Sequence, residues 1–283
     1  MINIHDLIAI NRPIKVVDVG AMSLGDGVTP PYHPLVTRGI AEIIGFEPVQ
    51  HECDKLNSRA KSHEKYLPYF IGDGSRRTFH LCNYSMTSSL YEPNTPLLDR
   101  FVNLENLVRV VNKSSVETRR LDEIAEATNA EFLKIDVQGA ELDVFKGATN
   151  LLDDVLVIHT EVEFLPLYKQ QPLFADVDAY LREHGFLLHK FADVCGRMFK
   201  PLADTKNPNT WVNQPLWADV VYVKSFMDME RLTDEQLLRL TTILHDVYGS
   251  VDLCAALLSH YDSRTGNDLS EKYIQKLIAA GPT

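Results

Sequence analysis

Cysteine is scarce in this sequence, and no cysteine belongs to a metal-binding or redox motif. The four cysteines are far apart, without a CxxC pair or a histidine at zinc-finger spacing; they are Cys53, Cys82, Cys195 and Cys254. This pattern argues against a zinc finger and predicts reduced thiols, which suit the cytoplasm. Because the first strand-like segment already begins at Ile14, we expect no signal peptide and a cytoplasmic protein.

Basic runs and long apolar segments are lacking too. The 28 lysines and arginines are outnumbered by 39 aspartates and glutamates, which gives a formal net charge of -11. A nucleic-acid binder needs Lys and Arg to neutralise phosphates, so we do not expect a nucleic acid as partner. No apolar stretch approaches the roughly 20 residues of a membrane-spanning helix, so we expect no membrane segment.

Short apolar segments alternate with helical segments over most of the chain. Strands are expected at residues 14–19, 41–46, 66–71, 131–137, 155–162, 186–191 and 218–223, with an extra strand at 77–83. Helices are expected at residues 51–62, 139–152 and 174–184. This alternation predicts a doubly wound α/β fold, in which a mostly parallel, seven-stranded sheet is covered by helices on both faces.

Two segments depart from this rhythm. Residues 93–115 include an amphipathic stretch at 97–111, and we expect them to form a lid-like insertion over a pocket. From Thr233 the chain is helical, with a plausible capping box at Thr233 and Gln236 and a further helix at 269–280. We therefore expect a main domain at residues 1–226 and a helical extension at 227–283, which either packs on the sheet or forms a homodimer contact.

Acidic residues and a glycine follow the first two predicted strands. In an open α/β sheet, ligands bind beyond the carboxyl ends of the strands, at the point where the strand order reverses. The first strand ends with Asp18, Gly20 and Ala21, and the second ends with Glu47 and Pro48. A glycine allows close approach of the backbone to a ligand, and a carboxylate one unit later can bind ribose hydroxyls. These residues predict a cofactor that contains adenosine.

The loop after the first strand does not fit a dinucleotide. A GxGxxG turn holds the pyrophosphate of NAD, whereas this loop has Gly20, Gly25 and Gly27, with Asp26 between the last two. Asp26 would repel a pyrophosphate. S-adenosylmethionine has no phosphate and carries positive charge on a sulfonium and an ammonium group. The charge of the loop therefore favours the methyl donor.

The fourth predicted strand holds charged residues in an apolar setting. Strand alternation places Lys134 and Asp136 on one side, opposite the apolar residues Leu133 and Ile135. Lys134 either pairs with a carboxylate or meets a ligand. Asp136, at the strand end, is expected to face the substrate or the cofactor, whereas the role open to Glu141, in the first turns of the following helix, is an interaction with the helix dipole.

The fifth predicted strand adds His159, Glu161 and Glu163, which share one face. Together with Asp136 they form an acidic group at the carboxyl edge of the sheet. Such a group acts as a general base or holds a hard divalent cation, for which Asp136, Glu161 and Glu163 are the candidate ligands. His159 is either a reserve base or a structural residue.

Six segments resemble the FkbM family of methyltransferases, in the family's order. They are VVDVGA (16–21), GFEP (45–48), SMTSSL (85–90), TRRLDEI (118–124), FLKIDVQGAELDVFKGA (132–148) and EVEFLPLYKQQPLF (161–174). The resemblance implies a class I, Rossmann-like fold that binds S-adenosylmethionine, and O-methylation of a hydroxyl on a sugar, a glycan or a polyketide-like small molecule. The sequence departs from the family where Met22, Ser23 and Leu24 precede Gly25.

The resemblance also implies roles for single residues. Asp18, Gly20 and Ala21 would line the methionine end of the cofactor, and Glu47, followed by Pro48, would hold the ribose hydroxyls. Asp73 would lie near the adenine together with Ser88 or Ser89. Asp136 and Glu161 would face the site of methyl transfer. Two other readings of the chain are an NAD or nucleotide-sugar enzyme on a similar sheet, and a non-catalytic scaffold that acts through the helical extension.

Overall fold

A computed structural model describes residues 2–22 and 28–281 of the chain. Gly25, Asp26 and Gly27 of the predicted glycine-containing loop lie outside the described residues. Within them, no helix is both long and apolar enough to cross a lipid bilayer.

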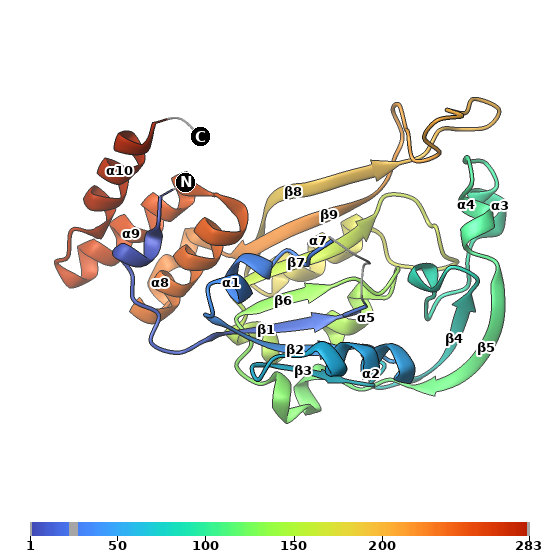
Figure 1. The fold of residues 1–283 in the computed structure, drawn as a ribbon, viewed down its shortest axis with the longest axis horizontal. Helices are drawn as coiled ribbons and strands as arrows, with labels where there is room; N and C mark the ends of the chain where they lie inside the picture. Colours follow the sequence, from blue (N-terminus) through green and yellow to red (C-terminus); the bar gives the residue numbers. More distant parts are fainter. Residues whose placement is uncertain (1, 23–27, 282–283) are drawn as a thin grey trace.

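A seven-stranded sheet organises the molecule (Figure 1). Its strand order is β3 (Glu64–Leu67), β2 (Ala41–Phe46), β1 (Ile14–Val19), β6 (Phe132–Ile135), β7 (Val157–Glu163), β9 (Pro215–Lys224) and β8 (Phe186–Gly196). The first five strands are parallel, and β9 is antiparallel to both β7 and β8. The predicted doubly wound, mostly parallel seven-stranded sheet is confirmed.

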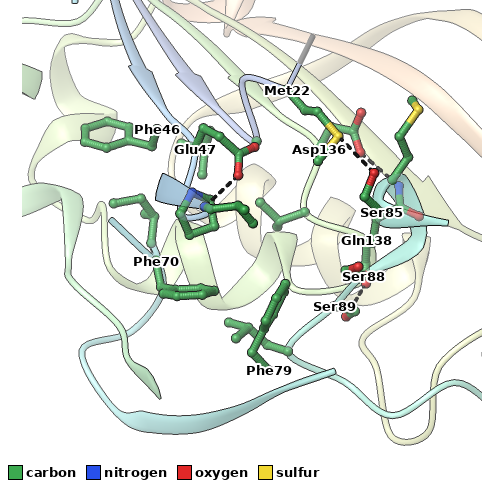
Figure 2. Close-up of a pocket in the computed structure, with 18 of the residues that line it drawn as sticks. Met22, Phe46, Glu47, Phe70, Phe79, Ser85, Ser88, Ser89, Asp136 and Gln138 are labelled. Carbon is green, nitrogen blue, oxygen red and sulfur yellow. Dashed lines mark hydrogen bonds between the residues drawn. The ribbon is translucent and has the colours of Figure 1, made fainter. Parts of the chain in front are cut away.

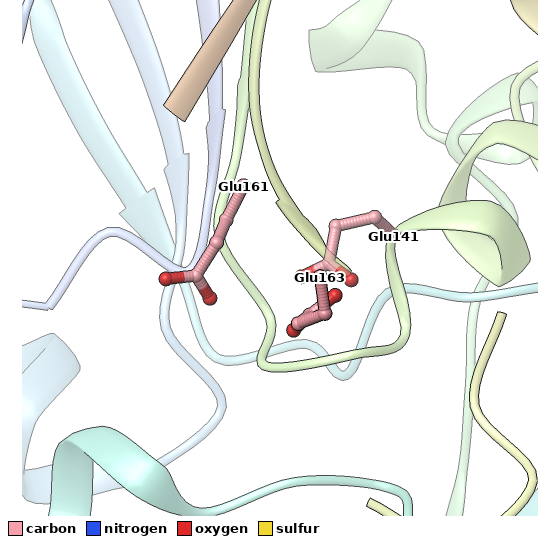
Figure 3. A group of neighbouring side chains, drawn as sticks. All are labelled: Glu141, Glu161 and Glu163. Carbon is pink, nitrogen blue, oxygen red and sulfur yellow. The ribbon is translucent and has the colours of Figure 1, made fainter. Parts of the chain in front are cut away.

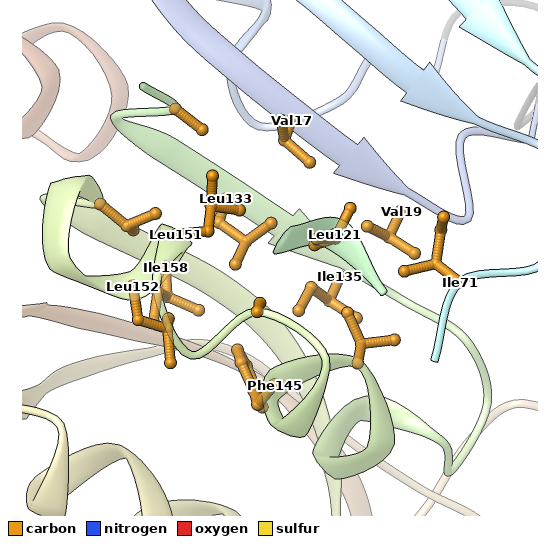
Figure 4. Close-up of a cluster of buried hydrophobic side chains, with 14 of the residues drawn as sticks. Val17, Val19, Ile71, Leu121, Leu133, Ile135, Phe145, Leu151, Leu152 and Ile158 are labelled. Carbon is orange, nitrogen blue, oxygen red and sulfur yellow. The ribbon is translucent and has the colours of Figure 1, made fainter. Parts of the chain in front are cut away.

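Both faces of the central strands are buried, as their continuous apolar sequences require. One face packs against α5 (Glu141–Lys146) and α7 (Phe174–Glu183), and Figure 4 shows Val17, Leu133 and Phe145 in this core. The opposite face packs against α1 (His33–Thr37) and the C-terminal helices. The strand order reverses between β1 and β6, so the carboxyl ends of these two strands mark the place where a ligand is expected.

The smaller elements complete the connections between strands. They are α2 (Gln50–Arg59), α3 (Thr95–Leu98), α4 (Leu104–Leu107), α6 (Leu151–Asp154), η1 (Ile4–Asp6), η2 (Ser85–Thr87), η3 (Leu121–Glu123) and η4 (Ala125–Ala127). The predicted extra strand is β4 (Arg76–Cys82), which pairs with the antiparallel strand β5 (Val110–Glu117) in a second sheet. The proposed lid segment 93–115 thus consists of two short helices and the start of β5.

The predicted helix at 139–152 is wrong as a single helix, because it is divided into α5 and α6. Gly147 ends α5 and lies so close to the chain before β4 that a Cβ atom there would be 2.0 Å from the carbonyl oxygen of Gly72. Strands β8 and β9 are also longer than predicted and form an extended hairpin around residues 197–214. This hairpin reaches toward α3 and α4 (Figure 1), where Phe199 pairs with Phe101.

The C-terminal extension packs on the sheet. It consists of η5 (Phe226–Arg231), α8 (Asp234–Ile243), a π-helical turn η6 (Leu244–Tyr248), α9 (Val251–Thr265) and α10 (Leu269–Ala280). Leu240 and Leu257 belong to the same core cluster as Phe132 and Val221 of the sheet. The capping box is confirmed, since Thr233 N donates to Gln236 Oε1 and Gln236 N donates to Thr233 Oγ1. A homodimer contact through these helices stays a prediction.

Candidate active site

A cavity lies beyond the carboxyl ends of β1, β2 and β6, at the reversal of strand order. We call it the first cavity. Figure 2 shows that its walls come from the ends of these strands, from Phe70 and Phe79, and from residues 85–90. Among the predicted site residues, the following line it: Gly20, Glu47, Pro48, Ser88 and Asp136. Among the described residues, no lysine, arginine or histidine does so.

Gly20 allows β1 and β6 to converge at this cavity. Its φ of +82° lies in the left-handed region, and a Cβ atom on it would be 2.0 Å from the carbonyl oxygen of Asp136. The backbone N–H groups of Gly20 and Ala21 both donate to the Phe46 carbonyl at 3.0 Å, which joins the end of β1 to the end of β2. Any side chain at position 20 would therefore displace Asp136.

Glu47 is a buried carboxylate at the end of β2, with a relative exposure of 2%. Its Oε1 accepts a hydrogen bond of 2.8 Å from Val49 N, which fixes the orientation of the side chain (Figure 2). Burial raises the pKa of Glu47, although this hydrogen bond opposes the shift. A carboxylate in this position can accept hydrogen bonds from two neighbouring hydroxyl groups.

The opposite end of the first cavity is apolar and aromatic. Phe70, Ile71, Phe79 and Leu81 line it, and a flat ring system can pack between such side chains. Ser88 is nearby, and its Oγ accepts a hydrogen bond from Cys82 N at 3.0 Å. The cavity thus offers an apolar end for a ring and a carboxylate for hydroxyl groups.

Asp18 and Ala21 border a different cavity. The structure brings Asp18 to Tyr32, whose hydroxyl donates to Oδ2 at 2.7 Å, and to Lys134, whose Nζ is 3.2 Å from Oδ1. Lys134 Nζ also donates to the Gly20 carbonyl at 3.2 Å. Burial alone would lower the pKa of Lys134, but the negative charges of Asp18 and Asp136 outweigh this effect and raise the pKa above its usual value. The ammonium therefore stays charged. Of the two sequence interpretations of Lys134, the structure shows a carboxylate pair.

Gln138 joins Asp136 to Glu161. Its Nε2 donates to Asp136 Oδ1 at 2.9 Å and to Glu161 Oε2 at 2.7 Å, and its Oε1 accepts from the Tyr168 hydroxyl at 3.2 Å. The φ of Gln138 is +57°, a left-handed conformation that non-glycine residues adopt rarely. The two carboxylates predicted to face the reaction therefore belong to one hydrogen-bond network.

Glu161 also belongs to a group of three neighbouring glutamates. Carboxylate oxygens of Glu141, Glu161 and Glu163 are within 4.8 Å of one another (Figure 3). Burial raises the pKa of Glu141 to about 7, although hydrogen bonds from Val137 N and Gly139 N to its Oε1 oppose the shift. Burial, with the neighbouring carboxylates, also raises the pKa of Glu161 and Glu163 well above the usual range. This group contains Glu161 and Glu163 of the predicted cation ligands together with Glu141, which was not among them.

His159 faces the C-terminal extension. Its Nδ1 is 3.1 Å from the hydroxyl of Tyr248, and the two rings are stacked. Burial, with the nearby charge of Lys134, lowers the pKa of His159 to about 4. The imidazole is therefore neutral near pH 7. It borders the same cavity as Asp18, and its role as a base stays a prediction.

Residues 18–188, more than half of the chain, match the FkbM methyltransferase domain family. This chain belongs to the FkbM methyltransferase family. A search of the curated proteins finds no match. The resemblance of the six sequence segments to an S-adenosylmethionine-dependent methyltransferase is thus confirmed at the level of the family.

Solved structures with a similar fold are distant in sequence. Magnesium protoporphyrin IX methyltransferase from Synechocystis PCC 6803 with bound SAM is 9% identical, with a TM-score of 0.39, and covers 76% of this chain and 71% of its own. A putative tRNA methyltransferase from Streptococcus pneumoniae with S-adenosyl-L-methionine is 11% identical, with a TM-score of 0.34 and coverages of 93% and 92%. A protein of the NADB-Rossmann superfamily from Streptococcus agalactiae is 14% identical, with a TM-score of 0.37 and coverages of 94% and 90%.

Two sequence predictions, the adenine role that the FkbM resemblance implies for Asp73 and the lid that the amphipathic pattern suggests, are not visible in the lining of the first cavity. Asp73 does not border it, because its Oδ1 accepts hydrogen bonds from Ser75 N at 2.9 Å and Ser75 Oγ at 2.5 Å within a tight turn. No residue of the proposed lid 93–115 borders it either, among the residues described. Both roles stay predictions.

Gln138, Tyr32 and Tyr168 hold the FkbM site together and were not predicted from the sequence, whereas Ser89 was expected near the adenine but not in its observed contact. Gln138 lies in the KIDVQGAE segment, but its left-handed backbone has no signal in the sequence. Ser89 Oγ donates to the Gln138 carbonyl at 2.6 Å, which fastens the wall 85–90 to the end of β6. Tyr32 and Tyr168 come from distant segments, so their contacts with Asp18 and Gln138 follow only from the fold.

Proposed function

We propose that the first cavity binds S-adenosylmethionine and that the protein transfers its methyl group to a hydroxyl oxygen of a small molecule or glycan. The observation that supports this most directly is the position of Glu47. It is buried at the end of β2 and lines the same cavity as the rings of Phe70 and Phe79 and the carboxylate of Asp136. In this arrangement Phe70 and Phe79 would enclose the adenine, Glu47 would bind the ribose hydroxyls, and Asp136 would lie near the methionine end.

The charge of the cavity favours this cofactor over a phosphate-bearing one. Glu47 and Asp136 are the charged residues among the described lining, and no basic side chain is available to bind a phosphate. A dinucleotide or a nucleotide sugar would place its phosphates against these carboxylates without compensation. S-adenosylmethionine, when bound, supplies a methyl group on a positively charged sulfur.

The carboxylates next to Asp136 give the chain a way to accept a proton from the acceptor. A hydroxyl becomes a better nucleophile as its proton leaves, and a base acts best when its pKa lies near the working pH. Burial and neighbouring charges raise the pKa of Glu161 well above its usual range, which makes it a stronger base, and Gln138 links it to Asp136. Asp136, whose side chain remains 33% exposed, would contact the hydroxyl, with Glu161 as the second proton site.

The acceptor class is the part of the proposal that rests on the FkbM resemblance. Family members methylate hydroxyls of sugars, glycans and polyketides, and the acidic network suits removal of a proton from such a group. A divalent cation at Asp136, Glu161 and Glu163 stays a prediction. A divalent cation would do the same by binding the oxygen directly.

Methyl transfer to a panel of sugars, glycans and polyketides tests the proposal. Asp136→Asn and Glu161→Gln should each lower turnover by about 10²- to 10⁴-fold, because each removes a proton acceptor. Both should still bind S-adenosylhomocysteine. Glu183→Gln, an exposed carboxylate on α7, is the matched control. Full turnover in both variants would refute the assignment. Assays with and without EDTA show whether turnover requires the predicted divalent cation.

A further inference from the structure

A row of carboxylates crosses the sheet next to the proposed reaction site. In the register of β7, β9 and β8, Glu161 lies opposite Asp219, and Asp219 lies opposite Asp193. Residues directly opposite each other on neighbouring antiparallel strands point to the same face, and like charges in such pairs are destabilising. Asp136 continues the row at the end of β6. The protein therefore keeps an unfavourable line of negative charge at this edge.

A second cavity opens over three members of this row, Asp136, Asp193 and Asp219. Its volume is about 490 Å³, within the range of small-molecule sites. Its charged and imidazole side chains are those of Asp18, Lys134, Asp136, His159, Asp193 and Asp219. Thr29 adds a hydroxyl, and Tyr32 and Tyr66 add aromatic walls. Met22 and Asp136 border both cavities, so the second cavity adjoins the proposed cofactor site at the carboxylate assigned to the reaction.

The charges of the second cavity do not cancel. Lys134 is the single cationic lining residue among those described, and its Nζ already contacts Asp18 at 3.2 Å and Asp136 at 3.8 Å. The side chain of Asp219 has no hydrogen bond or ion pair with any described residue, and burial together with Asp136 raises its pKa to about 6. Asp193 accepts only from its neighbours Val194 N and Cys195 Sγ, as far as the described chain goes.

His159 provides a second, independent indication of a ligand. It is nine-tenths buried, with 7% exposure, and it borders the cavity. Tyr248 occupies its Nδ1, while Nε2 has no hydrogen bond to a described residue. An imidazole nitrogen that borders the cavity without a partner in the described chain can exchange a hydrogen bond with a hydroxyl group of a ligand.

We propose that the second cavity binds the methyl acceptor, and that this acceptor is a polyhydroxylated amine, such as an amino sugar with a free ammonium group. The ammonium would lie against Asp193 and Asp219, and hydroxyls would reach His159 and Asp136. This inference rests on the proposed methyltransferase function, since it assigns the partner of the same site. An anionic acceptor is disfavoured because the cavity has no free cation among its described lining residues.

Calorimetric titration with two matched trisaccharides tests the inference. One is the glucosamine trisaccharide, which is cationic, and the other is its fully N-acetylated form, which is neutral. Both are titrated into the full chain saturated with S-adenosylhomocysteine. The cationic sugar should bind at least about tenfold more tightly, and added salt should reduce this preference.

The variant Asp193→Asn/Asp219→Asn should lose the preference for the cationic sugar while its affinity for S-adenosylhomocysteine stays unchanged. It should also fold, because it removes like charges that face each other. Glu183→Gln, which removes an exposed charge far from the cavity, should keep the preference. Equal or tighter binding of the neutral sugar, no binding of the cationic one, or a preference that survives in the double variant would overturn the inference. Failure of S-adenosylhomocysteine to bind would instead overturn the proposed function.

Discussion

At the scale of the residue, Gln138 connects the proposed reaction site. Its side-chain N–H groups donate to Asp136 and Glu161, and donation to a carboxylate favours the ionised form. Gln138→Leu should therefore raise the pKa of the Glu161 carboxyl further. Since the proposed base must be ionised, the acidic limb of kcat/KM against pH should move to higher pH, by about one unit.

Gln170→Leu is the matched control for this shift. Gln170 also has a left-handed backbone, with φ of +60°, but it is exposed and makes no side-chain hydrogen bond with the described chain. Its variant should leave the pH profile unchanged. An unmoved profile in Gln138→Leu, or equal shifts in the two variants, would contradict the role given to Gln138.

Some of these residues were predictable from sequence, and the reason is geometric. Glu47 and Asp136 follow apolar strands, and the ends of parallel strands converge at one edge of a sheet. Gln138 was missed because a left-handed glutamine looks like any other in sequence. The row from Glu161 to Asp193 was missed because its cross-strand register depends on the β8–β9 hairpin, whose length the sequence did not indicate.

At the scale of the element, α8 is attached to the sheet by a buried ion pair. Arg239 is almost fully buried and donates through Nε and Nη2 to Glu131, at the start of β6. It also donates to the carbonyls of Arg12 at 3.0 Å and Pro13 at 2.8 Å. Arg239→Leu should lower the free energy of unfolding by about 3–5 kcal/mol, because it leaves Glu131 buried without its main partner.

Urea denaturation measures this loss. Arg231→Leu is the control, because Arg231 is exposed and forms no salt bridge within the described residues. Its effect should stay within about 0.5 kcal/mol. A loss of less than 1 kcal/mol in Arg239→Leu would mean that packing alone holds α8 on the sheet.

Elements with strong apolar periodicity were predictable, and those fixed by contacts were not. Strands β1, β2 and β7 are buried on both sides and were found close to their true ends. Strand β5 was missed because most of its side chains are exposed, so it has no alternating pattern. The break between α5 and α6 follows from the contact of Gly147 with Gly72, which local sequence does not encode.

At the scale of the whole molecule, the buried glutamates make stability depend on pH. Glu141, Glu161 and Glu163 have pKa values raised by burial and by neighbouring carboxylates, so the folded state binds more protons than the unfolded one. The stability linked to them is therefore fully present below about pH 4.5 and is lost as the pH rises through about 7, the value for Glu141.

Glu163→Gln should remove part of the stability loss that occurs as the pH rises, because it removes one of these ionisable groups. The variant should be more stable than the wild type at pH 8, by on the order of 1 kcal/mol, and the difference should shrink toward pH 4.5. Thermal unfolding across this range measures the difference, with Glu183→Gln as the exposed control. A variant that is less stable than the wild type at pH 8 would contradict this prediction, because it would show that the folded protein stabilises the ionised form of Glu163.

The account as a whole depends on the cofactor, and calorimetric titration with S-adenosylhomocysteine tests it most directly, with NAD titrated in parallel. We predict that S-adenosylhomocysteine binds with micromolar affinity and that NAD does not bind. In Glu47→Ala the affinity for S-adenosylhomocysteine should fall by at least about tenfold, because the ribose hydroxyls lose a charged acceptor. Glu42→Gln, at the other end of β2, should bind as the wild type does. Binding of NAD alone, or unchanged binding in Glu47→Ala, would contradict the placement of the cofactor in the first cavity.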